Sequence, residues 1–167
     1  MKRMIVVAVL VVACITWAIA AGWAATDQKT LTVNATVADK AKLTLGVAAI
    51  DFASADPDAT PSIAAAENPV TVTVKANTSS SSTVTLTVQA NGDLLGSGSD
   101  SIAIANVTWT ASGAGFAAGT MNTAPVSAGS WTGSGNRSGT FSYFLANSWA
   151  YPKGSYTQTV VYTLTAP

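Results

Sequence analysis

Histidine and cysteine, two of the side chains most often used as base or nucleophile, are almost absent from this chain. The sequence has no histidine, and its single cysteine, Cys14, lies in an apolar N-terminal run. A Ser–His or Cys–His arrangement therefore cannot form beyond that run, and no motif supports a Ser–Lys arrangement. We expect no catalytic residues, no cofactor and no enzymatic activity.

Carboxylates are the next groups that could carry chemistry. Asp51, Asp56 and Asp58 could supply the oxygen ligands that calcium prefers. Their spacing fits no calcium-loop pattern, however, and Asp56-Pro57-Asp58 is explained by turn formation. We expect no metal site.

Aromatic side chains are the remaining candidates for binding. Exposed Trp and Tyr can stack on sugar rings, whereas buried aromatics build the cores of small β domains. Trp109 follows the inward alternation of its segment and is expected in the core. Trp149 and Tyr151 precede Pro152 in an expected loop and are candidate glycan contacts, with Trp131 as a third candidate.

The N-terminus has the layout of a secretory signal peptide. Met1-Lys2-Arg3-Met4 is a basic start, and the apolar run follows. Small residues suited to cleavage stand in the segments Ala18-Ile19-Ala20 and Gly22-Trp23-Ala24. We expect residues 1–24 to be a signal peptide cleaved after Ala20 or Ala24. Two alternatives are an uncleaved anchor over residues 5–25 and a lipoprotein modified at Cys14.

About 143 residues would remain after cleavage, which is enough for one domain. Six basic and eight acidic side chains give them a net charge near −2, without a basic cluster. This charge pattern argues against binding to nucleic acid or to an anionic membrane, and we expect no membrane insertion after cleavage. The abundance of Thr, Ser, Ala, Gly and Val favours an all-β domain over disorder.

Short alternating segments separated by turn residues predict a β-sandwich. We expect a loop over residues 53–68, with one or two helical turns after Pro61, a loop tip over 91–100, and short edge strands with loops over 111–139. The expected strands are 30–38, 40–47 continued by 50–52, 69–77, 82–90, 102–110, 139–146 and 154–165.

Three segments resemble subunits of chaperone–usher pili, in particular the archaic group related to spore coat protein U domains. They are LTVNATV at 31–37, IDFASADPD at 50–58 and YPKGSYTQTVVYTLTAP at 151–167. The last is the most specific, because a Gly and then a Tyr two residues later lead into an alternating strand. The resemblance covers roughly residues 28–167.

The resemblance implies an immunoglobulin-like β-sandwich that lacks its last strand, with residues 25–38 as a donor extension and 39–167 as the pilin domain. A periplasmic chaperone would lend a strand, an outer-membrane usher would export the subunit, and a neighbouring pilin subunit would complete the sheet by donor-strand exchange. The protein would then be a structural subunit of a surface fimbrium that serves adhesion or biofilm formation, exported to the periplasm and on to the cell surface.

Two sets of side chains would form the junction. The donor strand would present Leu31, Val33, Ala35 and Val37, which alternate with polar residues. The groove and the chaperone-binding strand would present Tyr156, Val160, Tyr162 and Leu164, with Gln158 interrupting that face.

A different reading is a self-contained secreted β-sandwich. It would bind carbohydrate through Trp149, Tyr151 and Trp131, or it would form a surface coat or matrix. In that case residues 30–37 would pair with a strand of their own chain.

Overall fold

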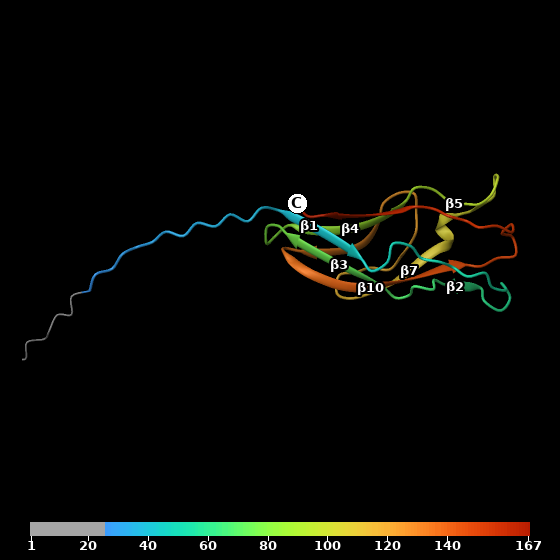
Figure 1. Cartoon of the computed structure of the whole chain (residues 1–167), viewed down its shortest axis with the longest axis horizontal. Helices are drawn as coiled ribbons and strands as arrows, with labels where there is room; N and C mark the ends of the chain where they lie inside the picture. The colour runs from blue at the N-terminus through green and yellow to red at the C-terminus, as the bar shows by residue number, and fades with distance from the viewer. Residues whose placement is uncertain (1–25) are drawn as a thin grey trace, which may run out of the picture. The chain divides into compact units, whose positions relative to one another are not determined.

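The computed structural model describes residues 26–167, so the predicted signal peptide over residues 1–24 lies outside the described part (Figure 1). The described chain is all-β: its strands are antiparallel, and its one helical element is the short 3₁₀ helix η1 (Ile104–Asn106). Within the described part, residues 26–35 and residues 36–167 belong to separate units, and the strands all lie in the second.

The larger sheet has the strand order β1-β3-β10-β7-β8, and β2 pairs with the C-terminal end of β10. Its strands are β1 (Lys40–Leu45), β2 (Ser62–Ala64), β3 (Val70–Asn77), β7 (Val107–Ser112), β8 (Gly119–Thr120) and β10 (Gly135–Ala146).

The smaller sheet has the order β11-β4-β9, with a register irregularity between β4 and β9 at Leu86/Thr87. Its strands are β4 (Thr83–Ala90), β9 (Val126–Thr132) and β11 (Val160–Thr165). A separate two-stranded hairpin consists of β5 (Leu94–Leu95) and β6 (Ser101–Ile102).

The core follows from alternation along the central strands. In β3, Val70, Val72, Val74 and Ala76 are buried, and the residues between them are exposed or half-buried. β4 has the same pattern, so each strand turns one apolar face inward. Buried side chains of both sheets join in one cluster, as in a β-sandwich. Its largest fully buried members are Phe141, Leu86, Val72, Val74, Val84 and Val88.

Several expected strands are confirmed, with boundaries that shift by a few residues. Segments 40–47, 69–77 and 82–90 correspond to β1, β3 and β4, and the end of segment 154–165 is β11. Segment 102–110 begins with β6 and η1 and becomes the long strand β7 only at Val107.

Four local predictions are wrong. Residues 50–52 belong to no strand. The segment after Pro61 forms β2 instead of helical turns, because Ile63 and Ala65 alternate into the core while β2 pairs with β10. The expected loop tip over 91–100 contains β5 of the β5–β6 hairpin.

The fourth concerns residues 111–139: the short edge strand β8 agrees with the expectation, but the rest of the range holds longer strands than expected. β9 has 7 residues, and β10 has 12 and begins at Gly135. The first half of β10 is rich in Gly and Ser, and it is held by backbone pairing with β3 over Gly135–Phe141. Pairing with a neighbouring strand therefore outweighs the weak strand propensity of these residues.

Candidate functional site

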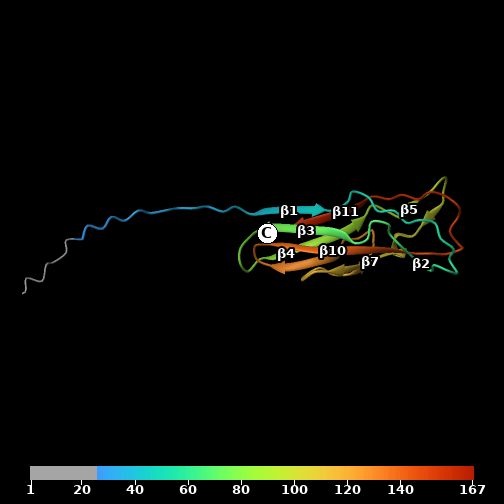
Figure 2. The same ribbon diagram turned by 60° about the horizontal axis from the view of Figure 1, so that its bottom comes forward.

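The edge strands β1 and β11 lie side by side along one edge of the domain in both views (Figures 1 and 2). Each pairs with one neighbour: β1 with β3, and β11 with β4. No ladder joins β1 to β11 within residues 26–167. We call this boundary, with its inward side chains Leu43, Leu45, Val160, Tyr162 and Leu164, the β1/β11 seam.

The inward side chains of the seam are incompletely covered. Val160, Tyr162 and Leu164 are half-buried, and Leu43 and Leu45 on β1 have the same status. The inward residues of the neighbouring strands β3 and β4 are fully buried. The seam is therefore the place where the described domain leaves inward-facing apolar surface open to solvent.

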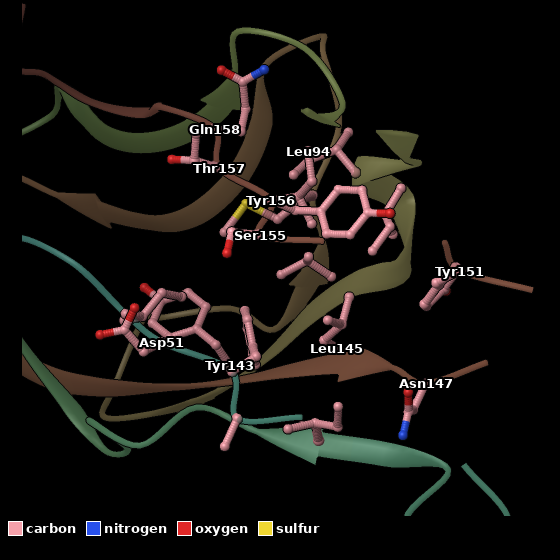
Figure 3. Close-up of a pocket in the computed structure, with 18 of the residues that line it drawn as sticks. Asp51, Leu94, Tyr143, Leu145, Asn147, Tyr151, Ser155, Tyr156, Thr157 and Gln158 are labelled. Atoms are coloured by element: carbon pink, nitrogen blue, oxygen red, sulfur yellow. The ribbon is translucent and has the colours of Figure 1, made fainter. Parts of the chain in front are cut away.

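A cavity of about 1020 Å³ lies at the end of the seam where β11 begins. Figure 3 shows Tyr143 and Leu145 of β10 on one side of it and Leu94 and Tyr156 on the other. The loop after β1 and the segment that leads into β11 also line it, so both edge strands border the cavity. Polar and apolar groups line this hollow in nearly equal measure, and its apolar part can accept side chains of a further segment.

Tyr143 and Tyr162 connect the two sheets across the seam. Their hydroxyl oxygens are 2.7 Å apart, so one donates a hydrogen bond to the other. The ring of Tyr162 also stacks on Phe141, with 6.4 Å between ring centroids. Burial raises the pKa of Tyr162 well above its ordinary value, and the nearby Tyr143 adds to this shift. Burial raises the pKa of Tyr143 as well, although its hydrogen bond to Tyr162 acts in the opposite direction.

The other residues predicted for the groove lie on the same side of the C-terminal segment. Val160 and Leu164 are half-buried in β11 and pack against the core. Tyr156 precedes the strand, packs against the core and donates its hydroxyl to the carbonyl of Pro152 at 2.6 Å. Gln158, the polar interruption, donates its side-chain amide to the carbonyl of Asp93 at 2.7 Å, so it is tolerated among apolar neighbours.

The four residues predicted for the donor strand lie in a segment that forms no strand in the single chain. Residues 26–39 have no assigned secondary structure, and their side chains are exposed. Leu31, Val33 and Val37 are 85%, 82% and 78% exposed, and the small Ala35 is exposed too. The segment thus carries three large apolar side chains in water, at alternate or near-alternate positions.

The candidate glycan contacts divide into an exposed and a buried group. Trp149 is 71% exposed, and Tyr151 is half-buried and donates its hydroxyl to the carbonyl of Ala146. Trp131 is buried, and its indole nitrogen donates to the carbonyl of Ala114, so Trp131 as a surface contact is wrong. The expectation that Trp109 belongs to the core is confirmed, since it is 2% exposed.

Tyr143 and the loop after β1 border the cavity at the end of the seam, and sequence reasoning missed this. The alternation of segment 139–146 shows that Tyr143 points inward, but no local signal indicates that its partner would be Tyr162. Val47, Ile50 and Phe52 after β1 are half-buried and line the cavity. Their apolar character is the sequence signal that could have identified them as part of its lining.

Within residues 26–167, no three acidic, histidine or cysteine side chains gather as a metal ion would need. The same part of the chain contains no helix with the length and apolar character required to cross a bilayer. No known protein-family model matches this chain, and a search of curated proteins finds no match either.

Proposed function

We propose that this protein is a non-enzymatic structural subunit of a surface fimbrium, in which Thr30–Val37 of one copy fills the β1/β11 seam of the next. The observation that carries the proposal is a pair of complementary features in one chain. One is an exposed segment with alternating apolar side chains. The other is a seam of half-buried apolar residues between two edge strands.

The dimensions of the two parts agree. A strand from Leu31 to Val37 spans roughly 20 Å at about 3.3 Å per residue, comparable to the length of the six-residue strand β11. A strand added at an exposed edge gains main-chain hydrogen bonds, and its alternate side chains enter the pockets beneath. Leu31, Val33, Ala35 and Val37 would be those side chains.

Side-chain burial and main-chain pairing are the two terms that would stabilise the junction. Burial of Leu31, Val33 and Val37, now largely exposed, would contribute roughly 1.5–3 kcal/mol each. Ladder hydrogen bonds would add about 0.5–1.5 kcal/mol each. The cost of ordering the segment and of association is subtracted from this sum.

In this proposal the domain is an immunoglobulin-like sandwich that lacks one strand until a partner supplies it. The resemblance to archaic chaperone–usher subunits supports a route in which a periplasmic chaperone lends a strand and an outer-membrane usher exports the subunit. The partners at the cell surface are identical or related pilin subunits, and the fibre would serve adhesion or biofilm formation.

The alternative is a self-contained sandwich that binds carbohydrate or forms a coat. It requires residues 30–37 to pair with a strand of their own chain. Because residues 26–39 form no strand in the described chain, strand exchange is the better explanation for the apolar alternation.

The decisive experiment changes one side chain of the donor segment. Val33→Asp would place a charge in an apolar seam, at a cost of several kcal/mol, and it should abolish fibres. Thr32→Asp is the matched control, because its side chain belongs to the opposite face of the same strand, and it should preserve them. Electron microscopy and the size of the protein in hot detergent provide the readout.

A truncated chain that lacks residues 25–38 gives an independent check. It should stay folded, fail to polymerise and bind an added peptide of sequence TLTVNATVAD, since its seam is empty. A wild-type protein that remains monomeric at every concentration, or fibres that persist in Val33→Asp, would contradict the proposal.

A further inference from the structure

Trp149 is the exposed tryptophan of the described domain. Three tryptophans lie in the described residues, and Trp109 and Trp131 are buried with their ring nitrogens bonded to backbone carbonyls. Trp149 is 71% exposed. A large aromatic ring left in water gives up the burial energy that its size could provide and leaves a flat apolar face open to a ligand.

The loop that carries Trp149 is anchored to a second loop. The side-chain amide of Asn147 donates to the carbonyls of Ala55 and Thr60, at 3.1 and 3.0 Å. The backbone N–H of Asn147 donates to the carbonyl of Pro61 at 2.9 Å. These three bonds hold the loop after β10 against the loop before β2.

Further hydrogen bonds fix the loop of Trp149 itself. The Ala150 N–H donates to the side-chain oxygen of Ser148 at 3.1 Å, and the Tyr151 hydroxyl donates to the carbonyl of Ala146 at 3.0 Å. Trp149 therefore stands on a preorganised base, which reduces the entropy lost when a ligand binds. In this arrangement the half-buried Tyr151 supports the loop.

A carboxylate lies at the edge of the exposed indole. The Trp149 ring nitrogen donates to Asp58 Oδ1 at 3.1 Å. This bond orients the ring and places an exposed, acceptor-rich group at its edge, beside the open face. The Asp58 N–H is in turn bonded to Asp56 Oδ1 at 2.9 Å, so the turn that carries the carboxylate is ordered too.

We propose that Trp149 and Asp58 form a binding site for a neutral sugar ring. A pyranose has an apolar C–H face that can stack on an indole, and hydroxyl groups at its rim that can donate hydrogen bonds to a carboxylate. The acidic side chains disfavour anionic ligands. A quaternary ammonium ion prefers a cage of several aromatic rings, whereas this site offers one open ring face.

None of the side chains that define the seam contributes to the site, although Trp149 also borders the cavity at the end of the seam. A subunit that fails to polymerise should still bind sugar, and a fibre of the Trp149→Ala variant should still form. Failure of either proposal can therefore be recognised separately.

The test uses the full secreted chain and acrylamide quenching of tryptophan fluorescence. Trp23 remains in the secreted chain if cleavage follows Ala20, so it is replaced by Phe in every protein of this test. Because Trp109 and Trp131 are buried, the accessible signal then comes from Trp149. Neutral hexasaccharides of β1,4-linked glucose, α1,4-linked glucose and β1,4-linked N-acetylglucosamine serve as probes. At least one should protect Trp149 from acrylamide in a saturable manner.

Variants assign the binding to the two side chains. Trp149→Phe should retain the affinity within about threefold, since a stacking face remains. Asp58→Asn should weaken binding about tenfold, because it removes a charged acceptor. Trp149→Ala, which loses the stacking face, should bind the sugar about tenfold more weakly than the wild type or worse. Titration calorimetry measures the affinity of all three variants. Unchanged thermal unfolding would show that the variants remain folded.

Three results would overturn the proposal. They are the absence of protection by all three sugars, wild-type affinity in folded Trp149→Ala, and protection by tetramethylammonium instead of sugar.

Discussion

The hydrogen bond between Tyr143 and Tyr162 offers a direct test of how the two sheets are held together at the seam. Tyr162→Phe removes one hydroxyl and keeps the ring, so the stacking on Phe141 remains. The Tyr143 hydroxyl, on a side chain only 3% exposed, loses its partner. A buried hydroxyl without a partner costs about 1–3 kcal/mol, and we expect the free energy of unfolding to fall by that amount at pH 7.

The same substitution should change how stability depends on pH. The pKa of Tyr162 in the folded protein is raised above the ordinary 10.0, first by burial and then by Tyr143. Below pH 10 the folded and unfolded states both keep the proton, and the contribution to stability is complete. Above pH 10 the unfolded chain ionises while the folded one does not, so stability falls by up to about 1.4 kcal/mol per pH unit for each such tyrosine.

Urea unfolding followed by far-ultraviolet circular dichroism, at several values between pH 7 and pH 11, measures both effects. Tyr162→Phe removes one group that titrates only on unfolding, so its alkaline slope should be shallower than that of the wild type. Tyr151→Phe is the matched control for the loss of a hydroxyl at pH 7: it removes one that is bonded to a backbone carbonyl in an exposed position, so it should cost less stability than Tyr162→Phe, which leaves a buried hydroxyl without its partner. Equal stability and equal slopes in Tyr162→Phe and the wild type would refute the reasoning.

Two further predictions concern the larger sheet. Lys42 and Lys75 lie directly opposite each other on β1 and β3. Lys75→Glu replaces this like-charge pair with an opposite-charge pair, so it should raise the free energy of unfolding by about 0.2–1 kcal/mol in low salt. The gain should be smaller in 1 M salt, which screens the charges. A Cβ at Gly139 would collide with the backbone carbonyl of Ser112 on the adjacent strand. Gly139→Ala should therefore destabilise the domain by about 1–3 kcal/mol in thermal unfolding. Gly135→Ala is the control and should cost less, because its Cβ meets only the movable end of the Arg137 side chain.

The strands that could be predicted from the sequence are those whose alternation reflects burial on one side. β3 and β4 have strict apolar alternation, and both are found within a residue of the expected boundaries. The first half of β10 could not be predicted, because its Gly and Ser residues gain their strand conformation from pairing with β3. Periodicity reports which face is buried, but it carries no information about which strands are neighbours.

The candidate site could be predicted in part. The alternation of the C-terminal segment places Val160, Tyr162 and Leu164 on one face, and the structure has them half-buried at the edge of the smaller sheet. The contact of Tyr162 with Tyr143 joins different sheets and depends on the packing of the whole sandwich. Trp131 was misjudged for a similar reason, because the carbonyl of Ala114 that accepts its ring N–H lies 17 residues away.

The two edges at the seam differ in a way that bears on where an additional strand would pair. Lysine side chains on an edge strand discourage pairing with other chains, since docking would desolvate or crowd their charges. β1 carries Lys40 and Lys42, both exposed. The exposed positions of β11 are Val161, Thr163 and Thr165, none of which is charged.

The free edge of β11 therefore has no comparable protection, and its residues favour β structure. We expect an incoming strand to form its ladder with β11 while its apolar side chains fill the space toward β1. The fully buried core lies mainly on strands other than these two edges. The domain can thus hold its fold while β11 stays unpaired on one side, which is the state that assembly by strand exchange requires of a subunit before it meets the next one.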